Sequence, residues 1–239
     1  MSYGTNTNSP QGFQPSVYMN GAPWSGQTAD YSLVSGYATS LFSGDPITWD
    51  TNGTIAIATA GNPMLGVFWG VTYTDTTGAV QFSRYWNANT VTQGALNATV
   101  HVIDDPNVLY DVATSTINNQ PGPANAPSVL QTDLGRNINF AIASAANSFN
   151  ALPVGTVGPG AGTTPAANPR TGNTISGNSA YFLDYNSIGN TATKNCKIIR
   201  FTPVPNNGPG GANGPFFQNL IVKINNDIYN GGTGTLGAS

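Results

Sequence analysis

The sequence predicts an all-β protein built as a β-barrel or a β-sandwich. Short stretches of alternating apolar and polar residues recur along the chain, and turn residues separate them. The 239 residues include 29 Gly and 17 Pro, a composition that favours turns over helices. Hydrophobic residues make up 39% of the chain and aromatic residues 10%, which is enough to build a core.

The composition divides the chain into three parts. Residues 1–30 are polar and rich in turn residues, and we interpret them as an extended N-terminal arm. We expect residues 31–116 to form the barrel or sandwich core, and residues 117–239 to form a second β-rich region. Long Gly/Pro loops are expected at 117–128 and 153–178, and loops of this length are functional or disordered.

Turn residues place the strands of the core. Gly44-Asp45-Pro46 is typical of a turn, and Asn52-Gly53 is a strong hairpin signal. Within the nearly continuous apolar stretch 64–73, Gly66 and Gly70 indicate places where another backbone approaches closely. The expected strands are 31–41, 47–49, 54–60, 64–73, 80–86, 98–103 and 108–112 in the core, and 137–142, 181–183, 197–201 and 220–224 in the second region.

The charge content indicates a surface that is buried in an assembly. Only 7% of residues are charged, all ten acidic residues are Asp, and the net charge is −3. Neutral amides and hydroxyls cost less to desolvate than charges, so this surface suits an interface. The alternative is an ordinary Asn/Thr-rich surface on a viral or extracellular β-protein. The pI near 4.7 gives no basic stripe, and we expect no nucleic-acid binding.

Three aromatic residues of the arm are candidate contacts with a partner. Phe13, Tyr18 and Trp24 stand as isolated apolar anchors in a polar segment, a pattern typical of docking onto another surface. The alternative is that the arm folds back on its own domain. The segment Met1–Thr5 lacks the pattern of an export signal, and no stretch approaches 18 apolar residues, so we expect no membrane association.

Few residues suggest chemistry, and we expect no enzymatic activity, cofactor or metal. His101 is the only histidine and lies within a predicted strand, where a structural role is expected. Asp104-Asp105 before Pro106 could bind Ca²⁺, but a solvated turn is the preferred interpretation. The single Cys196 excludes an intrachain disulfide and is expected to be a small buried side chain.

A series of motifs between residue 43 and about residue 113 carries a family resemblance. The motifs are Gly44-Asp45-Pro46-Ile47, Gly53-Thr54-Ile55, Ala60-Gly61, Leu65-Gly66-Val67-Phe68, Phe82-Ser83-Arg84-Tyr85-Trp86 and Asp104-Asp105-Pro106-Asn107. In this order they resemble the head decoration (cement) proteins and minor capsid proteins of tailed bacteriophages. The match covers roughly a third of the chain, with weaker similarity at 179–184 and 220–225.

The resemblance implies a β-tulip-like barrel core and no enzymatic activity or cofactor. It implies that the major capsid protein is the partner and that the protein binds the outside of the mature head. The virion would be assembled in the cytoplasm of the bacterial host. A homo-oligomer is expected, with a trimer favoured at three-fold positions of the shell.

Two other functions stay open at this point. A tail, neck or fibre protein would have a similar Asn/Gly/Thr-rich β-structure. A carbohydrate-binding β-module would use exposed aromatic rings as stacking platforms, and the candidate platforms are Trp49, Trp69, Tyr85 and Trp86.

Overall fold

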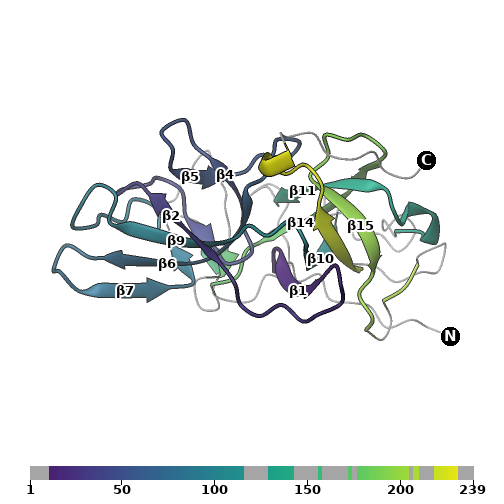
Figure 1. The fold of residues 1–239 in the computed structure, drawn as a ribbon, viewed down its shortest axis with the longest axis horizontal. Coiled ribbons are helices and arrows are strands. Elements are labelled where there is room, and N and C mark those ends of the chain that lie inside the picture. Colours follow the sequence, from purple (N-terminus) through teal and green to yellow (C-terminus); the bar gives the residue numbers. More distant parts are fainter. Residues whose placement is uncertain are drawn as a thin grey trace.

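The computed structural model describes residues 11–115, 129–142, 156–157, 172–173, 177–204, 207–209 and 218–230. Within these ranges the regular structure consists of β-strands and two 3₁₀ helices, η1 (Gln131–Asp133) and η2 (Ile228–Asn230). The strands form two main sheets, each with its own core, which lie next to each other along the long axis of the molecule (Figure 1). The all-β class predicted from the sequence is confirmed.

The first sheet has the strand order β2-β9-β6-β4-β5, and β7 pairs with the C-terminal half of β6. The sheet curls, so that Tyr31 on the edge strand β2 contacts Trp49 on β4, with ring centroids 5.1 Å apart. A short two-stranded sheet, β3 with β8, lies beside it. The bounds are β2 (Ala29–Leu33), β3 (Leu41–Phe42), β4 (Pro46–Trp49), β5 (Ile55–Ile57), β6 (Gly66–Thr74), β7 (Val80–Ser83), β8 (Tyr85–Trp86) and β9 (Ala98–Ile103).

The core of the first sheet follows from the alternation in its strands. Ala98, Val100 and Val102 of β9 are buried, whereas Thr99 between them is exposed. Phe68 and Val71 of β6 join the same core across a register shift between Phe68 and Gly70. The period-two pattern therefore selects which face of the sheet is buried.

The second sheet closes into a five-stranded barrel. The ring is β10-β14-β11-β15-β16, and β16 returns to pair with β10. β1 and β14 pair with the same edge of β10, β1 near the start of β10 and β14 at its C-terminal end. The bounds are β1 (Gln14–Tyr18), β10 (Val108–Ser115), β11 (Asn137–Ile142), β14 (Tyr181–Gly189), β15 (Cys196–Phe201) and β16 (Asn219–Ile224); a separate pair is formed by β12 (Thr156–Val157) and β13 (Gly172–Asn173).

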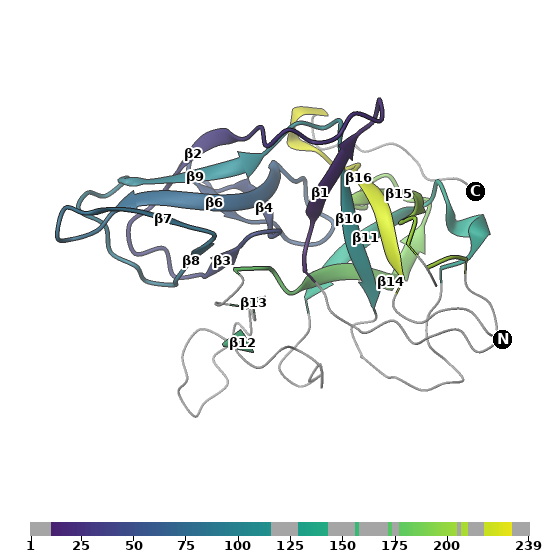
Figure 2. The ribbon, with the colours of Figure 1, turned by 90° about the horizontal axis from the view of Figure 1, so that it is seen from below.

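Side chains from all five strands fill the barrel. Tyr110, Phe140, Leu183, Ile198 and Val222 are each at most 2% exposed. Cys196 is fully buried among them, and burial raises the pKa of its thiol. Figure 2 shows β1, β10 and β16 side by side on this half of the molecule.

The chain passes from the first sheet to the barrel at residues 104–107. β9 ends at Ile103 and β10 begins at Val108, in the other sheet. The expected boundary at residue 116 is therefore placed one strand too late, because β10 pairs with β1, β14 and β16 rather than with β9. Ile103 and Val67 of the first sheet reach into the barrel core, so the two halves share buried contacts.

Buried asparagines connect the two halves. Asn195 of the barrel accepts a hydrogen bond from Gly61 N–H at 2.7 Å and donates to Asn62 O at 2.7 Å. Asn226 donates to Gly61 O at 3.1 Å, and its carbonyl accepts from Met64 N–H at 2.8 Å. The loop after β5 is thus held against the barrel by side-chain amides rather than by charges.

Several predicted strands differ from the structure. The predicted strand 31–41 is interrupted, because β2 ends at Leu33 and turns follow up to Leu41. The predicted strand 80–86 is split at Arg84 into β7 and β8, which belong to different sheets. The predicted strand at 137–142 is confirmed by β11. The loops expected at 117–128 and 153–178 lie almost entirely outside the described residues.

In the parts of the chain that the structure describes, no helix is long and apolar enough to cross a bilayer.

Candidate functional site

Exposed apolar side chains gather on the half of the first sheet that lies away from the barrel. Among the described residues, ten large hydrophobic side chains are exposed, and five of them belong to this region. Backbone hydrogen bonds hold its loops together, from Gln93 N–H to Thr74 O and from Ser35 N–H to Ala95 O. We call this region the distal surface, and its exposed apolar residues are Val34, Val80, Phe82, Val91 and Leu96.

β7 forms the outer edge of this surface. It pairs with β6 along one side, and no other described strand pairs with it. Val80 is 72% exposed and Phe82 is 66% exposed, although both lie in a strand. In Figure 1 β7 lies at the margin of the molecule, below β6. An apolar edge strand without a covering element is a template for pairing with another chain.

The outer face of the sheet next to β7 carries a row of hydrogen-bonded polar side chains. His101 Nδ1 lies 2.7 Å from Asp30 Oδ1, and His101 Nε2 lies 2.9 Å from Thr72 Oγ1. With the proton on Nδ1, the ring donates to Asp30 and accepts from the Thr72 hydroxyl. The Phe82 ring lies next to this row, 6.0 Å from the His101 ring. The row links β2, β9 and β6, and the expected structural role of His101 stays a prediction.

The two adjacent aspartates have separate partners. Asp104 Oδ2 accepts a hydrogen bond from the Tyr31 hydroxyl at 2.6 Å, and Tyr229 lies 2.8 Å from the same hydroxyl. Burial, followed by the hydrogen bond to Asp104, raises the pKa of Tyr31. Asp105 instead accepts from Asn107 N–H at 2.8 Å within the turn. Among the described residues, no group of three or more His, Cys, Asp or Glu could hold a metal ion.

The motif residues of the resemblance meet around β6, where most of them are buried. Gly44 N–H donates to Phe68 O, and Phe68 N–H donates to Asp45 O, both at 2.8 Å. Asp45 is 1% exposed and accepts a hydrogen bond from Phe42 N–H. Tyr85, Asp104, Asp105 and Pro106 are half-buried, and the other motif residues are buried. The full set is Gly44, Asp45, Pro46, Leu65, Gly66, Val67, Phe68, Tyr85, Trp86, Asp104, Asp105 and Pro106. The buried positions support the fold.

The residues proposed as arm contacts have different environments. Phe13 is fully buried and packs edge-on against Tyr110 and Phe140 of the barrel, with ring centroids 5.9 and 6.1 Å apart. Its prediction as a partner contact is therefore wrong for this structure, since the ring completes the chain's own core. Tyr18 and Trp24 are half-buried. Trp24 packs edge-on against Trp69 at 4.9 Å, so the described part of the arm folds back on the chain.

The candidate stacking platforms are mostly covered. Trp86 is 1% exposed, and Trp69 packs against Trp24 and against the guanidinium of Arg84, which is 5.4 Å from the ring centroid. Tyr85 stacks on Phe42. Trp49 is the exposed member of the set, with 39% of its side chain accessible beside Tyr31.

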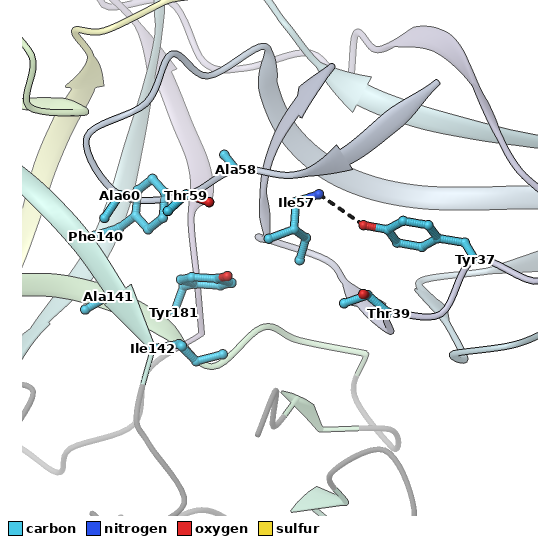
Figure 3. Close-up of a pocket in the computed structure, with 10 residues that line it drawn as sticks. All are labelled: Tyr37, Thr39, Ile57, Ala58, Thr59, Ala60, Phe140, Ala141, Ile142 and Tyr181. Carbon is cyan, nitrogen blue, oxygen red and sulfur yellow. Dashed lines mark hydrogen bonds between the residues drawn. The ribbon is translucent and has the colours of Figure 1, made fainter. Parts of the chain in front are cut away.

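A cavity of about 430 Å³ opens between the two halves. Figure 3 shows Ile57 and Tyr37 of the first half on one side, and Phe140 and Tyr181 of the barrel on the other. Ile57 N–H donates to the Tyr37 hydroxyl at 3.3 Å. The other side chains that line the cavity are apolar, apart from two threonines. This cavity can accept an apolar group.

The sequence did not identify the edge position of β7. The alternation correctly places Val80 and Phe82 on one face, but period-two patterning does not tell an edge strand from a central one. The signal that was available is the hairpin turn Asp75–Gly78 followed by a strand that is short and uncharged.

Searches of family models, curated proteins and solved structures found no match to this chain.

Proposed function

We propose that this protein is a structural subunit of a virion, a decoration (cement) protein that binds the outside of a mature bacteriophage head. The observation that carries the proposal is the distal surface, where Val80 and Phe82 are exposed along an unpaired edge strand. A free protein that presents such an edge is prone to association. An assembly subunit instead buries the edge within the assembly.

The low charge supports the same proposal. With 7% charged residues and a net charge of −3, little repulsion opposes close packing of many copies. A subunit that binds the expanded shell and not its precursor stabilises the mature form by mass action. The proposed partner is the major capsid protein, and the proposed role requires no catalysis or cofactor.

The structure changes which part of the chain is proposed to contact the shell. Phe13 and β1 belong to the barrel, so the described part of the arm does not supply the main contacts. The distal surface takes that role in the proposal, with Val91 and Leu96 exposed on the loop between β8 and β9. Substituting Leu96 and Val91 by Asp should abolish binding to shells without unfolding the protein, because both side chains are exposed.

Copy number tests the proposed function directly. Quantitative mass spectrometry of purified particles of the virus that encodes this chain should give a simple icosahedral ratio to the most abundant shell protein. Six, twelve or fewer copies would instead indicate a tail, neck or fibre protein. Absence from particles would end the virion proposal.

A carbohydrate-binding module is the second candidate. Trp49 is exposed, and Tyr31, Tyr229 and Asp104 lie next to it as hydrogen-bonding groups. An aromatic face beside a carboxylate is a common way to bind a sugar ring. Glycan-array binding that is lost in Trp49→Ala and kept in Val204→Ala, another exposed apolar side chain, would favour this function.

A further inference from the structure

The unpaired edge of β7 fits a second copy of the same strand. We propose that two copies of this chain pair antiparallel through β7, so that their first sheets join into one continuous sheet. The inference rests on the proposal that the chain is an assembly subunit, and it names the contact between its copies.

The hairpin register shows which backbone groups are free. Asp75 N–H donates to Ala79 O at 2.9 Å, so these two residues form a hydrogen-bonded pair next to the turn. Hydrogen-bonded and non-hydrogen-bonded pairs alternate along an antiparallel ladder. Val80 and Phe82, which lie opposite Thr74 and Thr72, are therefore in non-hydrogen-bonded positions. Their N–H and C=O groups point away from β6, toward the unpaired edge.

One register satisfies these groups in both copies. It places Val80 opposite Phe82 of the partner subunit and Phe82 opposite Val80 of the partner subunit, with the two-fold axis at Gln81. Residues that point their backbone groups outward then face each other, which allows four backbone hydrogen bonds. Both pairs combine a β-branched and an aromatic side chain, a favourable cross-strand combination.

The side chains agree with this register. Val80 and Phe82 lie on the same outer face of the sheet, where the Phe82 ring contacts His101. A two-fold axis perpendicular to the sheet joins equal faces, so the exposed valine and phenylalanine of one copy meet those of the other. Each side chain, 72% and 66% exposed in the single chain, would lose much of that exposure.

Charge also favours a second copy as the occupant. Residues 76–83 contain no charged side chain, so two copies of the strand do not repel each other. β7 has neither the lysine nor the proline that edge strands use to prevent such pairing.

The contact is two-fold, because identical antiparallel strands can only pair symmetrically. A three-fold oligomer, as expected from the sequence, would need a different surface in addition. The proposed pair can still link neighbouring oligomers on a shell.

A single engineered cysteine tests the register. Gln81 would lie opposite Gln81 of the partner subunit in a non-hydrogen-bonded pair, where Cα atoms are about 4.5 Å apart, a distance that permits a disulfide. We expect purified Gln81→Cys to form a covalent dimer under mild oxidation, measured by intact mass and non-reducing electrophoresis. The native Cys196 is fully buried and does not compete.

Matched variants on the same strand make the test specific. Val80→Cys alone should stay monomeric, since Phe82 of the partner subunit faces it, whereas the double variant V80C/F82C should form covalent dimers. Circular dichroism checks that all variants are folded. If Gln81→Cys formed covalent dimers no faster than Val80→Cys, the pairing would be overturned. If the single variant Phe82→Cys formed covalent dimers selectively, the register would be overturned. Because these measurements use purified protein, they are independent of the copy number in particles.

Discussion

Gly66 of β6 lies directly against the backbone of Ile103 in β9. A Cβ atom added at position 66 would be 2.3 Å from the Ile103 carbonyl oxygen and 3.0 Å from Asp104 Cα. The contact occurs where the chain leaves the first sheet for the barrel, so both halves depend on this close approach.

We predict that Gly66→Ala destabilises the fold by about 1–3 kcal/mol or more, because the added methyl group meets backbone rather than a movable side chain. Gly208→Ala is the matched control, since nothing lies within 4 Å of its added Cβ. Chemical denaturation of both variants measures the free energy of unfolding. Equal stabilities would contradict the close approach.

We predict that Phe13→Ala lowers the free energy of unfolding by about 3–5 kcal/mol, the usual cost of removing a buried phenylalanine. The ring is fully buried between Tyr110 and Phe140, so its loss leaves a cavity in the barrel. Met19→Ala, at a position 51% exposed and close in sequence, should change stability by less than about 0.5 kcal/mol. Equal stabilities of Phe13→Ala and Met19→Ala would contradict the burial of Phe13 in the barrel core.

Local patterns predicted much of the fold. Alternation placed β9 and β11, and the glycines of the stretch 64–73 correctly indicated close backbone approach at Gly66. These features depend on neighbours in the sequence, which a single sequence contains. The expected strand boundaries were less accurate, because sheet partners outside the strand decide where pairing ends.

Long-range contacts explain what the sequence did not predict. Phe13 is buried by residues about a hundred positions away, which nothing in the polar segment around it indicates. The predicted strand 80–86 is divided at Arg84 into β7 and β8. The pairing of β7 with β6 ends at Ser83, and the Arg84 carbonyl instead accepts a hydrogen bond from Ser43 N–H. The candidate site lies at this division, so the edge of β7 required the three-dimensional structure.

We predict that Asp111→Asn is more stable than the native protein at pH 7. Burial raises the pKa of Asp111 above its ordinary 3.8, against the opposing hydrogen bond from the Thr202 hydroxyl at 3.0 Å. The Asp111 carboxyl therefore binds its proton more tightly in the folded state than in the unfolded state. Protonated Asp111 thus favours the folded state at low pH, and this contribution to stability is lost as the pH rises through the folded-state pKa. Asparagine can still accept from Thr202 and carries no charge.

The pH dependence separates this cause from a packing effect. Thermal unfolding at pH 7 should favour Asp111→Asn, and the difference should vanish as the pH falls below the unfolded-state value of 3.8. A difference that is the same at both pH values would show that the carboxylate charge is not responsible.

The last prediction concerns the connection between the two halves. Asn195 is fully buried and bonds both Gly61 N–H and Asn62 O across the interface. Asn195→Ala removes both hydrogen bonds. Because each contributes roughly 0.5–1.5 kcal/mol, we expect the free energy of unfolding to fall by about 1–3 kcal/mol. Asn52→Ala is the control, because its side chain bonds Asp50 in an exposed turn. Hydrogen exchange should also become faster at Gly61 in Asn195→Ala and stay unchanged in Asn52→Ala, whereas equal exchange in both would show that the amide does not hold this loop against the barrel.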